Sequence, residues 1–154
     1  MQSENMSIRY ITDNARTRFY TTVFAEAFMA AGSYVENYIL NYAGRYSEGE
    51  WRYVSVSNGA FYMETPAPLY LRLPNYFEGE VSAKEAGIII SLSAFSHFCI
   101  VAFEESLSSL NNIMAARYHK LRDYVFTLDS DSQARIFSAL LTTTVDSEVR
   151  YDFW

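Results

Sequence analysis

The stretch Trp51–Met63, W-R-Y-V-S-V-S-N-G-A-F-Y-M, decides the fold that we predict for this chain. Six of its thirteen residues are aromatic or β-branched, which is typical of β-strands. Asn58-Gly59 divides the stretch, and this dipeptide favours a type I′ turn, in which two successive residues adopt positive φ. We therefore predict a β-hairpin with the arms Arg52–Ser57 and Ala60–Glu64.

Two further short strands are predicted after the hairpin. Pro66 and Pro68 disfavour a helix and suit an extended connection. Leu69–Leu73 alternates as a strand does, and Tyr76–Val81 is a candidate for a fourth strand. Because short strands in close succession favour antiparallel pairing, we predict one small antiparallel sheet of three to four strands.

A buried helix is predicted from about Ala83 to Phe98 or beyond. Ser82 and Glu85 form a capping-box pattern at its start, with Ser at the N-cap and Glu at N3. The helix is hydrophobic on nearly all sides, which indicates burial. A membrane helix is the alternative, because Ala86–Phe103 has no formally charged residue. Interrupting serines and His97 favour a core helix.

Helical periodicity before and after these elements completes an α+β fold. Arg16–Tyr42 is predicted as two helical pieces with the break at Gly32-Ser33. The apolar spacing from Leu107 to Leu128 fits one helix or a broken pair, and a last amphipathic helix contains Ile136–Leu141. Several helices are therefore expected to pack against the sheet.

Length and composition indicate a single domain, residues 1–154. The segments 1–14 and 145–154 are expected to be flexible ends. Cys99 is the single cysteine and lies in an apolar run, so we expect a reduced, buried thiol and a cytoplasmic protein. The N-terminal residues show no pattern typical of a signal peptide, which favours the same location.

The acidic charge balance disfavours a general DNA-binding protein. The net charge is −6; residues 1–75 carry 7 acids and 6 bases, and residues 76–154 carry 11 acids and 6 bases. Non-specific DNA affinity depends on phosphate contacts and usually on a basic excess. No part of the sequence clusters Lys and Arg. Direct DNA binding therefore stays open as a less favoured alternative.

No motif predicts a catalytic residue, a metal or a cofactor. His97 and His119 match no zinc-site spacing, and His97 is expected to be a hydrogen-bonded core histidine. No nucleophile or phosphate-loop signature is found. Glu78 and Glu80 lie two apart on a predicted strand and share one face. A solvated strand edge is the favoured interpretation of this pair, and a small carboxylate-dependent enzyme is the alternative.

The hairpin segment also resembles the central motif of the ArdB/KlcA antirestriction family, a pattern close to Y-x-G-G-x-W-x-x-Y-x-x-S-N-G-G-F-Y-M. Two glycines of that pattern are replaced here, by Glu48 and Ala60. Glu80–Ile88 resembles the family's E-M-S-x-x-A-A-G-I segment, and Tyr118–Asp123 is similar to a late Y-x-x-L-R-D. The matching motif residues, with structural or interaction roles, are Tyr46, Gly49, Trp51, Ser57, Asn58, Gly59, Phe61, Tyr62, Met63, Ser82, Ala86 and Gly87.

The resemblance implies a cytoplasmic, non-catalytic protein, encoded on plasmids or other mobile elements, that protects incoming DNA from type I restriction enzymes of the host. It implies a partner that is the restriction enzyme or its translocating complex on DNA, with restriction inhibited and methylation spared. Direct DNA binding that blocks the enzyme's translocation is the less favoured alternative. Full DNA mimicry is disfavoured. A compact chain of this length spans about 38 Å, and a duplex of that length carries roughly 22 phosphates, whereas this chain has 18 acids among 12 bases.

The acidic second half of the chain contains the predicted contact surface. Aromatic anchors within a charged rim suit protein interfaces. The candidate interaction residues are Glu78, Glu80, Asp146, Glu148, Tyr151, Asp152, Phe153 and Trp154.

Overall fold

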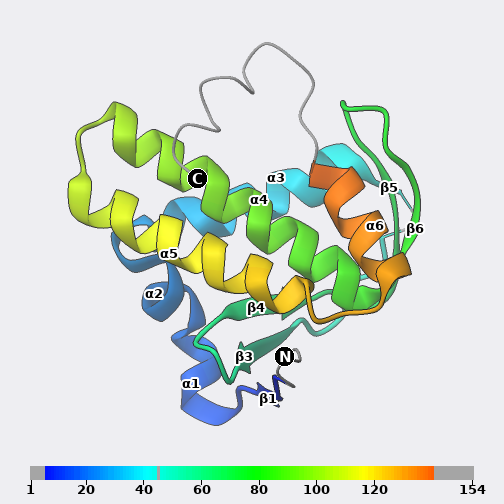
Figure 1. Ribbon diagram of the computed structural model, residues 1–154, viewed down its shortest axis with the longest axis horizontal. Helices are drawn as coiled ribbons and strands as arrows, with labels where there is room; N and C mark the ends of the chain where they lie inside the picture. The colour runs from blue at the N-terminus through cyan, green and yellow to red at the C-terminus, as the bar shows by residue number, and fades with distance from the viewer. Residues whose placement is uncertain (1–5, 45, 141–154) are drawn as a thin grey trace.

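The computed structural model describes residues 6–44 and 46–140, and it confirms the predicted α+β class (Figure 1). The described elements, in chain order, are β1 (Ile8–Tyr10), α1 (Asp13–Thr17), α2 (Phe19–Phe24), the 3-10 helix η1 (Ala25–Ala27), α3 (Phe28–Tyr42), β2 (Ala43–Gly44), β3 (Arg52–Val56), β4 (Phe61–Glu64), β5 (Leu69–Arg72), β6 (Glu78–Val81), α4 (Ala83–Glu104), α5 (Ser108–Val125) and α6 (Ser130–Leu140). The predicted segment 145–154 lies outside the described residues.

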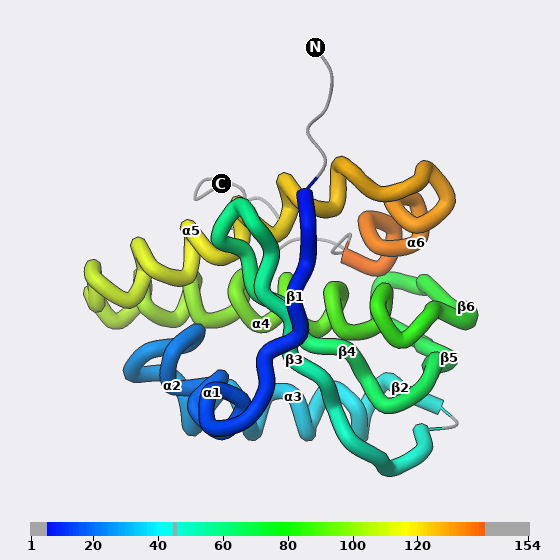
Figure 2. The backbone as a smooth tube through the Cα atoms, turned by 90° about the horizontal axis from the view of Figure 1, so that it is seen from below, coloured from blue at the N-terminus to red at the C-terminus, as the bar shows by residue number. Residues whose placement is uncertain are grey.

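Helix α4 forms the centre of the protein. It lies between α5 and α3, and the strands β1, β3 and β4 cross one face of this helical layer (Figure 2). By length and hydropathy α4 could cross a membrane, but 72% of its most apolar window is buried by its neighbours. The predicted core helix is therefore confirmed, and it continues beyond Phe98 to Glu104.

The start of α4 has the capping box that the sequence predicts. The Ser82 hydroxyl accepts a hydrogen bond from the Glu85 backbone N–H at 3.0 Å, and the Glu85 carboxylate accepts one from the Ser82 backbone N–H at 3.0 Å. Two N–H groups that a helix start would otherwise leave unpaired are thus satisfied. The same geometry directs the Glu85 carboxylate toward α6, where Arg135 donates to it.

The hairpin turns at Asn58-Gly59 as predicted, with Ser55 opposite Phe61, but the turn type differs. The Val56 C=O accepts from the Gly59 N–H at 2.9 Å, and Gly59 has φ 93° whereas Asn58 does not adopt positive φ. This is a type I turn followed by a left-handed glycine, so the type I′ prediction was wrong. The Asn58 side chain donates to the Lys120 C=O at 2.9 Å, which fixes the turn against α5.

Gly59→Ala is expected to lower the free energy of unfolding by about 1–2 kcal/mol, because an L-residue in the left-handed region costs that much. The added Cβ would lie 3.4 Å from the Lys120 Cδ, a contact that a flexible side chain can relieve. Urea denaturation measures the effect. The matched control is Gly79→Ala, since a Cβ there meets nothing within 4 Å; equal losses in both variants would be evidence against a backbone cause.

The strands form two sheets and not the single sheet predicted. The orders are β1-β3-β4 and β2-β5-β6, all antiparallel. Pro66 and Pro68 separate β4 from β5, and neither can donate a hydrogen bond to a continuous ladder. The third strand of the first sheet is β1, whose Ile8 pairs with Val56. The expectation that residues 1–14 are a flexible end was therefore wrong for β1.

The break in the N-terminal helical region lies at Ala25, not at Gly32-Ser33 as predicted. Ala25 has φ 52°, and α3 continues through Gly32. Arg117 of α5 donates to the Val23 C=O at 3.0 Å and to the Thr22 C=O at 3.1 Å. The last carbonyls of α2 are thus satisfied by a side chain distant in the sequence, which allows the helix to end there.

Candidate functional site

Several residues of the hairpin motif lie inside the protein, where they join α4 to β4. Tyr62 and Met63 have no exposed surface. The Met63 backbone N–H donates to the Ser91 hydroxyl at 3.2 Å. Gly87 approaches β4 so closely that an added Cβ would lie 1.6 Å from the Met63 carbonyl oxygen. These positions act in packing.

Other motif residues lie on the surface and form one wall of a groove. The Trp51 indole N–H donates to the Tyr46 hydroxyl at 3.0 Å. Gly49 packs on Pro66, since an added Cβ would lie 2.9 Å from the proline Cβ. We call this concavity the motif groove, and its volume is about 680 Å³. Its lining residues are Tyr20, Gly32, Val35, Glu36, Ile39, Leu40, Tyr46, Glu48, Gly49, Trp51 and Tyr53.

The motif groove combines aromatic walls with negative charge. Glu36 and Glu48 are the formally charged residues among those that line it, and neither forms an ion pair with another described residue. Burial, followed by the influence of Tyr53 and Glu36, raises the pKa of the Tyr20 hydroxyl, which stays protonated. Leu40 at the rim is 80% exposed. Aromatic faces beside carboxylates favour a basic side chain with an apolar stem.

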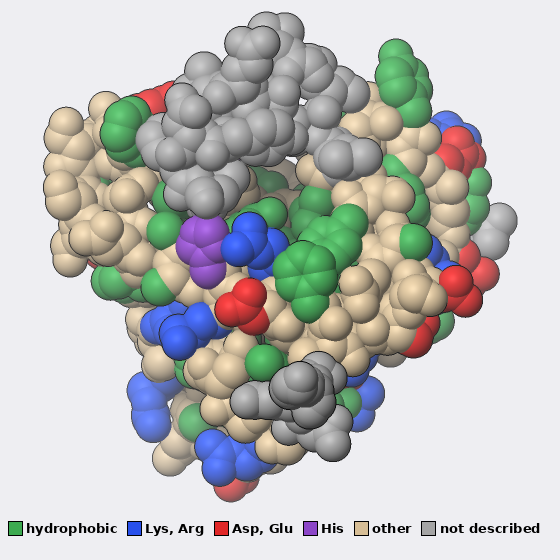
Figure 3. Space-filling model, viewed as in Figure 1, with side chains coloured by type: hydrophobic (Ala, Val, Ile, Leu, Met, Phe, Trp, Pro, Cys, Tyr) green, Lys and Arg blue, Asp and Glu red, His purple; other side chains and the backbone are tan. Residues whose placement is uncertain are grey.

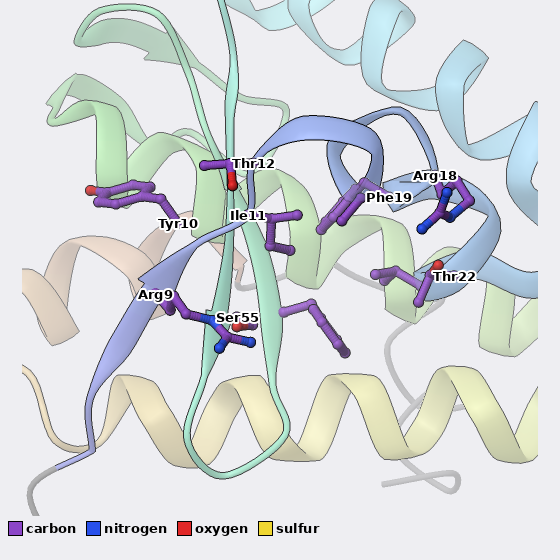
Figure 4. A pocket seen from close by; sticks show the side chains of 11 residues that line it. Arg9, Tyr10, Ile11, Thr12, Arg18, Phe19, Thr22 and Ser55 are labelled. Carbon is purple, nitrogen blue, oxygen red and sulfur yellow. The ribbon is translucent and has the colours of Figure 1, made fainter.

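A second concavity, the arginine cleft, lies between β1 and the helices α1 and α2 (Figure 4). Its volume is about 420 Å³. The lining residues are Arg9, Tyr10, Ile11, Thr12, Ala15, Arg18, Phe19, Thr22, Val23, Ser55 and Phe61. None of these described lining residues carries a carboxylate. Lys and Arg side chains gather at this lower end of the molecule (Figure 3).

This basic region was not predicted from the sequence, because its members come from separate elements. Arg9 is on β1 opposite Ser55, Arg18 stands at the start of α2, and Arg117 reaches the last carbonyls of α2 from α5. A signal did exist, since the described part of the first 24 residues holds three arginines, including Arg16, against one acid, Asp13.

The predicted contact residues Glu78 and Glu80 lie exposed on β6, at the edge of the second sheet. Glu78 accepts a hydrogen bond from the Tyr70 hydroxyl and pairs with Arg72 at 3.5 Å. The Tyr70 hydrogen bond is the main cause that lowers the pKa of the Glu78 carboxyl. The other predicted contacts, Asp146, Glu148, Tyr151, Asp152, Phe153 and Trp154, lie outside the described residues.

Within residues 6–44 and 46–140, no three His, Cys, Asp or Glu side chains gather as a metal site would require. Cys99 is buried as predicted, and burial raises the pKa of its thiol. His97 is exposed and lies with its ring 5.0 Å from that of Tyr34, so the core-histidine prediction was wrong. The two concave surfaces are suited to binding, and the described residues supply no arrangement typical of catalysis.

Comparisons with known proteins agree on one family. Residues 44–140 match the family model described as "Antirestriction protein". Two relatives are both antirestriction protein KlcA from Escherichia coli. One is 28% identical to this chain, and the match covers 80% of this chain and 87% of the relative. The other is 30% identical, and the match covers 84% of this chain and 90% of the relative. A solved structure from work on KlcA and ArdB superposes with a TM-score of 0.74 at 25% identity, covering 92% of this chain and 99% of the other. Those proteins are described as having a novel fold and antirestriction activity against type I DNA restriction systems in vivo but not in vitro.

Proposed function

Because this chain belongs to the antirestriction protein family, we propose that it protects incoming DNA from the host's type I restriction enzymes without catalysing a reaction. The observation that carries the proposal is the match over 84% of the chain to a relative named for antirestriction. The activity belongs in the cytoplasm, where incoming DNA meets the host enzymes. We place the whole chain, 1–154, in one domain.

The mechanism we favour is contact with the restriction enzyme or its translocating complex on DNA, without imitation of a duplex. Glu64 and Glu85, two of the 18 acids, are each only 4% exposed and form ion pairs with Arg52 and Arg135. Fewer than 18 carboxylates are thus available at the surface, against roughly 22 phosphates in a duplex of the same length. The surface carboxylates are therefore too few to match the phosphates of such a duplex.

The motif groove is the contact surface that we propose. Aromatic walls beside an exposed apolar rim suit the anchors of a protein interface. Glu36 and Glu48 would select a basic side chain of the partner, because opposite charges across an interface set register and specificity. Glu48 stands where the family pattern has glycine, so this chain has a charge there that the pattern lacks. The β6 carboxylates and the segment 145–154 stay as further proposed contacts.

Phage plating tests the activity. The gene is expressed in bacterial hosts with and without a type I restriction system, and unmodified phage are plated on each. We expect improved plating only in the restricting host, with methylation of host DNA unchanged. Equal plating with and without the gene would reject the function. A parallel loss of methylation would reject a restriction-specific mechanism and favour a general block of DNA binding.

Reversing both charges of the motif groove, Glu36→Lys with Glu48→Lys, is expected to reduce protection at least about tenfold, since like-charge contacts at an interface cost several kcal/mol. The matched control is Glu104→Lys with Glu105→Lys, an equal charge change at the exposed end of α4. Circular dichroism checks the fold of both variants. If the two double variants protect equally, the groove is not the contact surface.

A further inference from the structure

We propose that the arginine cleft binds a small phosphorylated ligand, with the phosphate held by Arg9 and Arg18. This goes beyond the proposed function, which requires only a surface for the restriction enzyme. The shape of the cleft, the charges that line it and the packing of its floor support such a site.

The cleft has the dimensions and donors of a small-ligand site. Its volume of about 420 Å³ falls in the range of about 300–1,000 Å³ that such pockets occupy. The two arginines lie on either side of the Phe19 ring (Figure 4). Hydroxyl groups of Thr12, Thr22 and Ser55 also line the cleft. Guanidinium and hydroxyl donors together match the acceptor oxygens of a phosphate.

The positive charges of the cleft are not neutralised by described neighbours. Arg16 pairs with Glu50 at 2.7 Å, and Arg52 pairs with Glu64 at 3.1 Å. Neither Arg9 nor Arg18 forms an ion pair with any residue of the described ranges. On a chain with net charge −6, two guanidinium groups that no described carboxylate pairs with concentrate positive potential beside this concavity. Planar guanidinium groups bind phosphate through paired hydrogen bonds.

The floor of the cleft is formed before any ligand arrives. Phe19 is 2% exposed and stacks on Tyr53 with ring centroids 4.4 Å apart. The Arg117 guanidinium lies 5.0 Å from the centre of the Phe61 ring and donates to the backbone of α2. These contacts hold β4, α2 and α5 together around the cleft. A preformed site loses less free energy to ordering on binding.

A small ligand fits these observations better than a nucleic acid does. Duplex binding requires a basic strip that follows many phosphates, and the overall acidic charge opposes it. An open cleft of this volume, lined by two exposed arginines, suits one terminal phosphate.

Binding is tested on the full chain by titration with inorganic phosphate and with adenosine monophosphate, followed by NMR and by thermal denaturation. We expect saturable binding with a dissociation constant below about 1 mM. Arg9→Gln with Arg18→Gln should weaken it at least about tenfold, because each charge-assisted hydrogen bond contributes substantially. Arg16→Gln, which removes an ion-paired arginine outside the lining, should leave the dissociation constant unchanged.

The outcomes separate the sources of phosphate and separate this proposal from the antirestriction function. A parallel titration uses a 20-base-pair DNA duplex. If the duplex binds more tightly than the mononucleotide, and its affinity falls steeply as the salt concentration rises, a small-ligand site is overturned. So would no saturable binding, or affinity that the Arg9 and Arg18 double variant does not change. Because binding is measured on purified protein, failure in phage plating leaves this result unaffected.

Discussion

Gly87→Ala is expected to lower the free energy of unfolding by more than about 3 kcal/mol, beyond the usual cost of overpacking a core. An added Cβ would lie 1.6 Å from the Met63 carbonyl oxygen and 2.4 Å from its carbonyl carbon. Both are backbone atoms of β4, so no side-chain rotation can relieve the clash. Relief requires α4 to separate from β4, which opens the centre of the core.

Gly32→Ala is the matched control for this prediction, because Gly32 is also a helical glycine. An added Cβ there meets nothing within 4 Å, and alanine is favoured over glycine in a helix by about 1 kcal/mol. The two substitutions should therefore have opposite signs in urea denaturation. Wild-type stability in Gly87→Ala would mean that α4 does not approach β4 as closely as the structure places it.

The elements that the sequence predicted best depend on residues close together in the chain. Asn58-Gly59 marks the hairpin turn, and Ser82 with Glu85 marks the start of α4. A turn dipeptide or a capping box involves residues at most three positions apart, so the signal is local. Both were confirmed, and with them the α+β class.

The features that the sequence could not predict depend on partners far along the chain. The break at Ala25 relies on Arg117 of α5, and the turn type at Asn58 is fixed by Lys120 of the same helix. The third strand of each sheet also comes from far away in the chain, since β1 joins the β3–β4 hairpin and β2 joins the β5–β6 hairpin. Local periodicity contains no information about such pairings.

The motif likewise identified important positions without separating their roles. Tyr62, Met63 and Gly87 lie in the α4–β4 contact, whereas Tyr46 and Trp51 form a wall of the motif groove. A sequence pattern does not separate these residues, although they belong to different parts of the fold. Tyr62 and Met63 are on β4 and Gly87 is on α4, whereas Tyr46 and Trp51 precede β3. Only burial in the folded protein distinguishes a packing residue from a surface one.

Glu85→Ala is expected to lower the free energy of unfolding by about 2–3 kcal/mol near neutral pH, since hydrogen bonds to a buried charged group contribute on that scale. The carboxylate is 4% exposed. It accepts from Arg135 at 3.0 and 2.8 Å, from the Ser132 hydroxyl at 2.7 Å and from the Ser82 backbone N–H at 3.0 Å. One side chain thus joins the start of α4 to α6.

Because Glu85 titrates, the difference in free energy of unfolding between wild type and Glu85→Ala should depend on pH. Burial alone raises the pKa of Glu85, but the hydrogen bonds from Arg135, Ser132 and Ser82 outweigh burial, so its pKa in the folded state lies below the reference of 4.5. For a lowered pKa, the stabilisation is fully present above the unfolded-state value and is lost as the pH falls through the folded-state value. Acidification should therefore destabilise the wild type more than Glu85→Ala.

Urea denaturation of wild type and Glu85→Ala at neutral pH and at about pH 3 measures how far their free energies of unfolding approach each other on acidification. Glu78→Ala is the control, because Glu78 is an exposed carboxylate that also pairs with an arginine, Arg72 at 3.5 Å. Its removal should leave the free energy of unfolding unchanged within error, since exposed ion pairs contribute little. A Glu85→Ala deficit that stays constant on acidification would show that packing, and not the ionised carboxylate, holds α6 to the start of α4.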